Sequence, residues 1–198
     1  AVELLSDDEP LNDSDRIAML KVLKNESIRL DKLAQDILAL ARIEHTTDEA
    51  KRAFAICDIS DVIKNVFTLM KPKTAAAGIG LILLKNESVK TACDAHLIEE
   101  AILNLIENAI RYSNSLTIDL SLESVGGRAK ITVSDKGVGI DKKHLPRLFE
   151  RFYRVDKARS REQGGTGLGL AIVKHIAQLH EGEVSVTSNL GEGCIVRG

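Results

Sequence analysis

Apolar and small residues at the start of the chain recur with the period of a packed helix. Two rows with a spacing of seven run through this stretch: Leu23, Leu30 and Ile37, and Leu20, Ser27, Ala34 and Ala41. The rows alternate by three and four, which is the coiled-coil period. This pattern predicts a long helix over Arg16–His45 that packs against other helices, with Asp13, Ser14 or Asp15 as its N-cap.

Beyond the polar stretch Thr46–Arg52, helical and alternating patterns follow one another. The predicted helices are Asp58–Ala77, Asp94–Tyr112, Asp141–Arg151 and Gly167–His180. Asp58 and Asp94 are the predicted caps of the first two. The predicted strands are Phe54–Ile56, a pair formed by Ile79–Leu84 and Val89–Cys93, Leu116–Leu122 joined to Ala129–Ser134 by a turn at Gly126-Gly127, Glu183–Thr187 and Cys194–Val196. This order predicts an α+β sandwich of one sheet and one helical layer, and not a βαβ array. Tyr153–Gly165 is polar and flanked by glycines, so we expect a mobile loop there.

Charge and composition exclude several classes of partner. The net charge is −2 with both signs interspersed, whereas a nucleic-acid-binding protein needs a clustered basic face. Aromatic residues make up 3% of the chain and Trp is absent, so stacking platforms for bases are not expected. Neither a signal peptide nor an apolar run of about 18 residues is present, so we expect no membrane contact in this chain. We expect a cytoplasmic location, as the cytoplasmic portion of a membrane-anchored sensor.

The cysteines give no sign of a metal or disulfide framework. Cys57, Cys93 and Cys194 are odd in number, widely spaced and without a CxxC pair. We therefore expect three buried free thiols.

Polar residues form one stripe along the predicted helix that ends near Tyr112. The stripe consists of Glu100, Asn104, Glu107, Asn108 and Arg111. Asparagine costs roughly 0.5–0.7 kcal/mol relative to alanine inside a helix, and neither asparagine lies where it could cap one. A side-chain amide oxygen is a suitable ligand for Mg²⁺, which also takes phosphate oxygens and water. The stripe is either a magnesium and phosphate site, with Arg111 near the phosphates, or a solvated polar face.

A short glycine motif, Asp135-Lys136-Gly137-Val138-Gly139, follows a predicted strand. Its glycines allow positive φ and a close approach of the backbone to a ligand. The Asp135 carboxylate accepts hydrogen bonds and suits an exocyclic amine such as that of adenine. A tight turn without a ligand also explains this pattern.

A second glycine motif, GGTGLGL over 164–170, opens a predicted helix. Free N–H groups at a helix N-terminus, together with glycines, form an anion site suited to phosphates. The motif is not a Walker loop, because no Lys-Ser/Thr pair follows. A dinucleotide fingerprint is disfavoured because the preceding segment is polar and no βαβ unit follows. Between the two motifs, Arg154 begins the polar loop and is a candidate contact for a terminal phosphate.

The segments NLIENAIRYS, DKGVGID, LFERFYR and GGTGLGLAIVK, in this order and spacing, resemble the catalytic ATP-binding domain of sensor histidine kinases. The resemblance covers the chain from about Arg52 onward and, more loosely, the helical stretch before it. It implies an α/β sandwich, a mixed sheet packed on helices, of the histidine-kinase, gyrase and chaperone ATPase type. It divides the chain into 1–48, part of a dimerisation and phosphoacceptor hairpin, and 49–198, the catalytic ATP-binding domain.

The resemblance also implies roles for single residues, with ATP and Mg²⁺ as cofactors. Asn108 would bind Mg²⁺, while Asn104 beside the phosphates and Arg154 at the γ-phosphate would be catalytic. Asp135 would hold adenine. The other nucleotide-binding residues would be Arg111 and Tyr112 at the phosphates and ribose, Gly137, Gly139 and Ile140 at adenine, and Gly165, Thr166, Gly167, Leu168 and Gly169 in the lid. Lys136 replaces the Asn common in the first motif, while Asp135 and both glycines are retained.

Related ATPases, which include gyrases, mismatch-repair proteins and heat-shock chaperones, hydrolyse ATP with a Glu one turn before the metal-binding Asn. This chain has Asn104 at that position, and an amide cannot act as a general base. The substitution favours transfer of phosphate over hydrolysis, with Glu100 and Glu107 as the nearby alternative bases.

In sensor kinases the acceptor His is followed by Glu or Asp and by Arg-Thr-Pro, and no such motif occurs here. We expect structural roles for all five histidines: His45, His96, His144, His175 and His180. The resemblance implies an acceptor upstream of Ala1, homodimerisation through the helical hairpin, and relay of the phosphate to an Asp of a response regulator. As given, the chain is expected to bind ATP without phosphorylating itself.

Two other functions stay open at this point. An anti-sigma-type serine kinase shares the ATP domain, although the long heptad helix disfavours it. A non-catalytic nucleotide-sensing dimerisation module is compatible with the missing acceptor.

Overall fold

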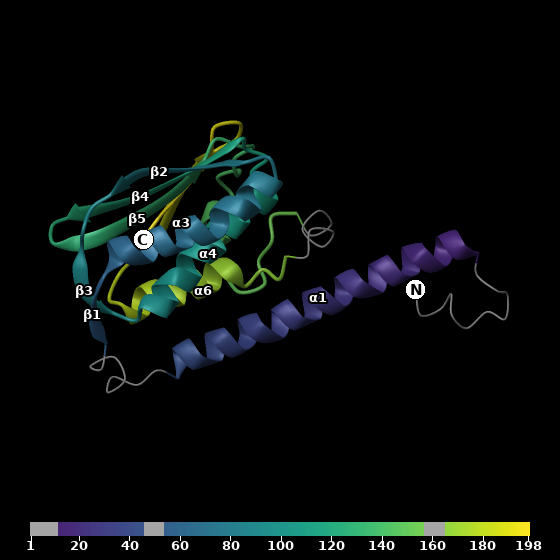
Figure 1. The fold of residues 1–198 in the computed structure, drawn as a ribbon, viewed down its shortest axis with the longest axis horizontal. Coiled ribbons are helices and arrows are strands. Elements are labelled where there is room, and N and C mark those ends of the chain that lie inside the picture. The colour runs from purple at the N-terminus through teal and green to yellow at the C-terminus, as the bar shows by residue number, and fades with distance from the viewer. Residues whose placement is uncertain (1–11, 46–53, 157–164) are drawn as a thin grey trace.

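A computed structural model describes residues 12–45, 54–156 and 165–198 as one open mixed sheet with helices on one face and a long helix alongside (Figure 1). The predicted domain boundary between residues 48 and 49 lies outside the described residues, as do residues 157–164 of the loop that was predicted to be mobile.

Four α-helices of the described residues match predicted ones, and caps fix where three of them begin. The long helix α1 (Asp13–Glu44) is confirmed, but its N-cap is Asn12, whose side chain accepts from the Asp15 N–H at 2.9 Å. The caps Asp58 and Asp94 are confirmed, because each carboxylate accepts N–H groups of the first turn that follows. These helices are α3 (Ile59–Ala76), α4 (Ala95–Tyr112) and α6 (Gly169–Leu179).

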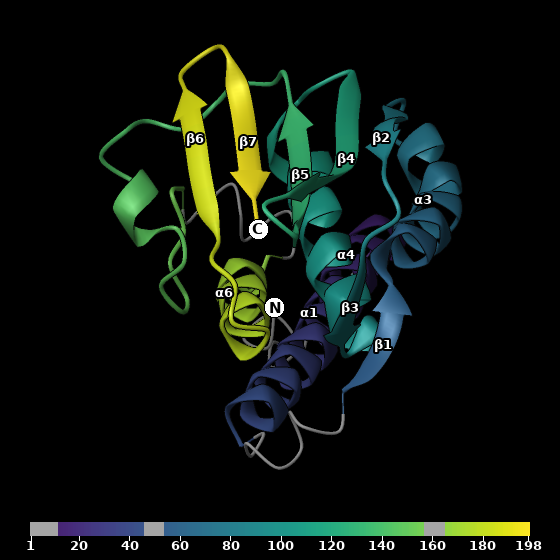
Figure 2. The ribbon, with the colours of Figure 1, turned by 90° about the vertical axis from the view of Figure 1, so that its left-hand side faces the viewer.

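Among the described residues, the strands form a main sheet and a second, two-stranded sheet. The main sheet has the order β2-β4-β5-β7-β6, in which β2 and β4 run parallel and the other neighbours run antiparallel (Figure 2). Its strands are β2 (Gly80–Asn86), β4 (Thr117–Val125), β5 (Arg128–Asp135), β6 (Ser185–Asn189) and β7 (Gly193–Arg197). The second sheet pairs β1 (Ala55–Asp58) with β3 (Lys90–Cys93).

The predicted pairing of Ile79–Leu84 with Val89–Cys93 is wrong, although both segments are strands. β2 pairs with β4, and β3 pairs with β1. The Asp58 carboxylate accepts from the Ser88 hydroxyl at 2.5 Å and from the Val89 N–H at 3.2 Å. These bonds direct the chain toward β1 as it leaves β2.

The predicted helix Asp141–Arg151 is also wrong, because only the 3-10 helix η2 (Leu145–Arg147) forms there. The N–H of His144 donates to Asp141 and that of Arg147 donates to His144, which is the i→i+3 pattern of turns and 3-10 helices.

The main core lies between the sheet and the helices α3 and α4. Alternate residues of β4, namely Ile118, Leu120 and Leu122, are fully buried. They meet apolar residues of the helices such as Ile63 and Ile106, which are also fully buried. One apolar face of each helix therefore covers the sheet, and α4 is left with a polar face turned toward the start of α6.

A smaller core holds α1 against α6. Leu40 and Ile43 of α1 are buried together with Ile172 and Ile176 of α6. The N-terminal part of α1 extends beyond the rest of the fold (Figure 1). Within the described ranges, no helix combines the length and apolar character that crossing a bilayer requires.

The prediction of three free thiols is wrong for two of them. Cys57 of β1 and Cys93 of β3 form a disulfide, with their Cα atoms 6.5 Å apart and a sequence separation of 36. Antiparallel pairing of the two strands brings them together, which their spacing in the sequence did not reveal. Cys194 is free.

Candidate functional site

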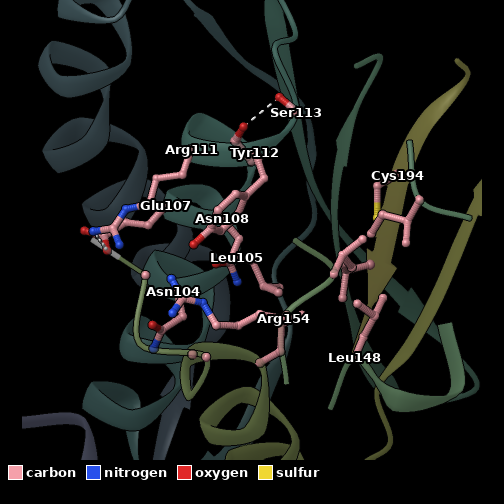
Figure 3. Close-up of a pocket in the computed structure, with 18 of the residues that line it drawn as sticks. Asn104, Leu105, Glu107, Asn108, Arg111, Tyr112, Ser113, Leu148, Arg154 and Cys194 are labelled. Carbon is pink, nitrogen blue, oxygen red and sulfur yellow. Dashed lines mark hydrogen bonds and ion pairs between the residues drawn. The ribbon is translucent and has the colours of Figure 1, made fainter. Parts of the chain in front are cut away.

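A cavity of about 340 Å³ lies between α4, the ends of β5 and β7, and the two glycine motifs. Figure 3 shows Asn104 and Asn108 on one wall, with Leu148 and Cys194 on the opposite wall. Arg154 extends from the loop toward Asn104 (Figure 3). The fold thus brings the predicted functional segments around one cavity, although they lie far apart in the sequence.

α4 presents its two asparagines to the cavity because its other face is in the core. Ile102 and Ile106 are buried against the sheet, which turns the polar stripe away from it. Asn104 is 9% exposed, and its Nδ2 donates to the Glu100 carbonyl at 3.1 Å. The side-chain amide of Asn108 has no hydrogen bond to another described residue and is available to a ligand.

Asp135, the last residue of β5, is half-buried at the other end of the cavity. Its Oδ1 accepts from the Gly137 N–H at 2.9 Å, and the carboxylate also accepts from the backbone N–H of Cys194. Burial raises the pKa of Asp135, and these two hydrogen bonds offset part of that effect. Because a carboxylate offers about four lone-pair sites, acceptor capacity remains for a donor on a ligand.

The turn after β5 is fixed by contacts with the end of α4. A Cβ at Gly137 would lie 1.9 Å from the Ser113 carbonyl oxygen, to which the Val138 N–H donates at 2.8 Å. The Ser115 hydroxyl accepts from the Lys136 N–H at 3.1 Å. Neither serine was predicted from the sequence, and both hold the first glycine motif at a set position relative to the asparagines.

The second glycine motif packs directly on the asparagines. A Cβ at Gly169 would lie 3.1 Å from Asn104 Oδ1 and 3.7 Å from Asn108 Nδ2. Gly167 has φ +78°, and a Cβ there would lie 3.0 Å from the backbone of Phe152. The start of α6, where N–H groups lack intrahelical partners, therefore borders the same cavity as both asparagines.

Charged residues around Glu107 keep it ionised. Burial acts to raise the pKa of Glu107, but the hydrogen bond and charge of Lys73, with the charges of Lys32 and Arg111, lower it below its ordinary value. Its carboxylate lies 2.5 Å from Lys73 Nζ and 3.5 Å from Arg111 Nη2. Glu100, whose pKa is raised by burial, does not line the cavity. Glu107 lines the cavity with its carboxylate engaged by two cations, and Glu100 lies outside it, so neither is well suited as a general base for a ligand there.

The structure brings most of the predicted site residues together. Those that line the cavity are Asn104, Asn108, Arg111, Tyr112, Asp135, Gly139, Ile140, Arg154, Gly165, Thr166, Gly167 and Gly169. Gly137 and Leu168 do not line it. Gly137 allows the close approach to Ser113, and Leu168 is 1% exposed in the core shared with α1. The roles of all these residues toward a nucleotide stay predictions.

Several lining residues of the cavity were not predicted, and four of them come from α1 or from the wall opposite α4. Lys32 and Asp36 come from α1, and Leu148 and Cys194 form the wall opposite α4. Burial, with the nearby charge of Asp135, raises the pKa of Cys194 to about 11, so it is a thiol at neutral pH. The one feature of the sequence that could have indicated Cys194 is the glycine before it, Gly193. A Cβ at Gly193 would lie 2.0 Å from the Asp135 carbonyl oxygen, so glycine is needed where this strand approaches Asp135. No local pattern indicated Lys32 or Asp36.

Comparison with known families gives a match over residues 93–197, to the family described as histidine kinase-, DNA gyrase B-, and HSP90-like ATPase. The matched range contains every predicted site residue and more than half of the chain.

Curated relatives are named as sensor histidine kinases. The chain is 35% identical over 178 residues to the sensor histidine kinase YkoH of Bacillus subtilis (strain 168), covering 89% of this chain and 38% of that protein. It is 37% identical over 169 residues to the sensor-like histidine kinase SenX3 of Mycolicibacterium smegmatis, covering 85% of this chain and 44% of that protein. The chain therefore spans less than half the length of these relatives.

Solved structures share the fold. Full-length ShkA in complex with AMPPNP matches with a TM-score of 0.73 and 25% identity, over 96% of this chain and 39% of that one. The histidine kinase AdeS of Acinetobacter baumannii matches with a TM-score of 0.70 and 23% identity, over 98% of this chain and 88% of that one. The fold and the family resemblance predicted from the sequence are thereby confirmed. The chain belongs to the histidine kinase-, DNA gyrase B-, and HSP90-like ATPase family.

Proposed function

We propose that this chain is the catalytic part of a protein histidine kinase, which binds Mg·ATP in the cavity and transfers the γ-phosphate to a histidine. One observation carries the proposal. The two asparagines of α4, the Asp135 turn, Arg154 and the second glycine motif converge on one cavity of about 340 Å³.

The Asp135 end of the cavity suits adenine. A half-buried carboxylate beside apolar walls is matched to the exocyclic amine of a base, which donates a hydrogen bond from an otherwise apolar ring. Val133, Ile140 and Leu148 supply apolar surface to the same cavity. Asp135 is fixed from two sides by the N–H groups of Gly137 and Cys194, so it orients the base without first rearranging.

The other end of the cavity suits a triphosphate with Mg²⁺. Asn108 offers an uncommitted amide, and the missing side chain of Gly169 leaves the start of α6 close to both asparagines. Asn108 would hold Mg²⁺ with one protein oxygen, and phosphates and water would complete its coordination. When bound, the ion would neutralise charge on the phosphates. Arg111 and Arg154 supply positive charge from two sides of the same region.

The residues favour transfer of phosphate over its hydrolysis. Phosphoryl transfer depends mainly on positioning and charge neutralisation. A hydrolase also needs a group that activates water, and the candidates here are unsuitable. Asn104 is an amide held by Glu100, Glu107 is paired with cations, and Glu100 lies outside the cavity.

The acceptor is proposed to be a histidine outside these 198 residues. None of the five histidines lines the cavity. His180 is stacked on Phe54 and accepts from the Asp94 N–H at 3.0 Å, while His144 bonds the Tyr153 hydroxyl at 2.7 Å.

Domain division and partners follow from the same proposal. Residues 1–48 would belong to a dimerisation hairpin, with a second copy of the chain as partner, and 49–198 to the catalytic domain. The exposed apolar side chains along α1 support this, and among them are Ile17, Leu20, Leu23 and Leu30. The phosphohistidine would pass its phosphate to an Asp of a response regulator, in the cytoplasmic portion of a membrane-anchored sensor.

The test is labelling with γ-labelled ATP and Mg²⁺, using the longest natural form of the protein together with calorimetry on this chain. We expect the chain to bind Mg·ATP and the longer form to acquire an acid-labile, base-stable label. An acid-stable label would indicate a serine kinase. Binding without any label would indicate a nucleotide-sensing module, and absence of binding would refute the proposal altogether.

A further inference from the structure

α1 contributes two charged side chains to the cavity of the ATP-binding half. Lys32 and Asp36 both line it, one helical turn apart, and their Nζ and Oδ1 atoms are 3.4 Å apart. Asp36 is 4% exposed, which is unusual for a carboxylate on a helix whose neighbouring residues are mostly in solvent. The packing of Leu40 and Ile43 against α6 holds this part of α1 in place.

The Asp36 carboxylate is bound to the second glycine motif. The Thr166 hydroxyl donates to Asp36 Oδ2 at 2.6 Å and accepts from the Leu168 N–H at 3.3 Å. Under the proposed function, this motif is the part of the site that receives the phosphates. A side-chain anion from α1 thus already accepts a hydrogen bond where a phosphate oxygen is expected to accept one.

A second polar contact of α1 serves as a comparison. Glu44 pairs with Arg151 and lies 3.6 Å from the Nε2 atom of His175. None of these three residues lines the cavity. Among the acidic residues of α1, Asp36 is the one that lines the cavity. The Asp36 and Glu44 contacts therefore differ in whether they can influence a bound ligand. The Glu44 contact can hold α1, whereas the Asp36 contact can also act on the ligand.

We propose that Asp36 is a specificity-determining residue of the nucleotide site, which opposes the terminal phosphate of ATP. The inference rests on the proposed function. A buried negative charge repels a nearby phosphate strongly, since little water separates the two. The repulsion grows with the number of phosphates that reach toward α1. A triphosphate therefore binds by displacing Asp36 from Thr166, while a monophosphate leaves that bond intact. Lys32 acts in the opposite sense because its positive charge attracts the same phosphates.

The test uses Asp36→Asn, which keeps the size of the side chain and a hydrogen-bond acceptor for Thr166 while removing the charge. Calorimetry would measure Mg·AMPPNP, Mg·ADP and AMP binding to the wild-type chain and the variant. Removing one negative charge beside the phosphates of a partly buried site changes their affinity by about tenfold. We expect AMPPNP to bind about tenfold more tightly to Asp36→Asn, ADP to gain less, and AMP to be unchanged.

The matched control is Asp31→Asn. Asp31 lies on the same helix, is exposed, and accepts from Gln35 at 2.9 Å. It carries the same charge but does not line the cavity, so its substitution should leave all three affinities unchanged. Lys32→Met is an independent variant with the opposite expected sign, namely weaker AMPPNP binding and unchanged AMP binding.

Three outcomes would overturn the inference while the proposed function stood. They are equal AMPPNP affinities for Asp36→Asn and Asp31→Asn, an equal gain for all three nucleotides, and weaker AMPPNP binding to Asp36→Asn. The last result would mean that the carboxylate helps to hold the metal ion. If the wild-type chain and both Asn variants bound no nucleotide, the proposed function itself would fail, and the inference with it.

Discussion

At the scale of single residues, the buried charge of Asp135 lowers the stability of the folded protein, while its carboxylate is proposed to bind adenine. Its pKa is raised by burial, which means that the folded protein holds its ionised form less well than the unfolded chain does. Asn keeps the Oδ1 atom that accepts from the Gly137 N–H and carries no charge. Asp135→Asn should therefore fold at least as stably as the wild type at neutral pH and bind nucleotide less well.

The expected loss of nucleotide affinity for Asp135→Asn is roughly tenfold to hundredfold, the effect of removing a hydrogen bond to a charged group. The pH dependence has a definite sign. Since the folded pKa lies above the ordinary value of 3.8, the stabilising contribution of Asp135 is present below that value and is lost as the pH rises through the folded pKa. Urea unfolding of both forms without nucleotide would measure it. A stability advantage of Asp135→Asn that failed to grow from pH 3 to pH 7 would contradict this account.

Gly137 is a second residue whose role is set by its surroundings. A Cβ there would lie 1.9 Å from the Ser113 carbonyl oxygen. Because the atoms in contact belong to the backbone of Ser113, they cannot move away as the end of a flexible side chain would. Gly137→Ala should lower the free energy of unfolding by about 2 kcal/mol or more. At Gly80 the nearest atoms lie at 3.7 Å, so Gly80→Ala is the control and should have little effect. Equal unfolding free energies of the two variants in urea would refute the close approach.

At the scale of elements, the sequence predicted best those features that depend on neighbouring residues alone, such as helix caps and tight turns. Asp58 and Asp94 were identified as caps because a carboxylate before an apolar periodic run has one obvious set of partners, the first free N–H groups. The turn at Gly126 and Gly127 was identified because both need positive φ, at +59° and +80°. The asparagines of α4 were conspicuous because their residue type is unfavourable inside a helix.

Strand partners and cysteine pairing could not be predicted in this way. The parallel pairing of β2 with β4 depends on α3 and α4 covering one face of the sheet. The sequence pattern of β2 is the same whichever strand lies beside it. The disulfide between Cys57 and Cys93 follows from that choice, because it requires β3 to pair with β1.

The disulfide makes a testable contribution to stability. Closing a loop between cysteines separated by 36 residues stabilises a fold by about 3–4 kcal/mol in the chain-entropy account. Reduction of the wild-type chain should therefore lower its free energy of unfolding in urea by about that amount. The double variant Cys57→Ala/Cys93→Ala is the control, since a reductant should leave its unfolding curve unchanged. A wild-type chain indifferent to reductant would show that the bond contributes nothing to stability.

At the scale of the whole molecule, the packing of α1 against the ATP-binding half could not be predicted from the sequence. Heptad spacing predicts that α1 packs on helices, but it does not say that α6 is one of them. Lys32 and Asp36 enter the cavity only because α1 lies against α6, so the cavity includes residues more than a hundred positions away from the glycine motif. The predicted site residues came from motifs, whereas these two came from the packing of one helix on another.

The proposed function depends most on the predicted role of Asn108 as the residue that binds Mg²⁺ in a nucleotide site. The direct measurement is calorimetric titration of Mg·AMPPNP into Asn108→Ala and into Asn65→Ala, a matched substitution on the exposed face of α3. The account predicts wild-type affinity for Asn65→Ala and a loss of at least about a hundredfold for Asn108→Ala, since even residues that only support metal ligands contribute ten- to hundredfold. Wild-type affinity in Asn108→Ala would contradict it.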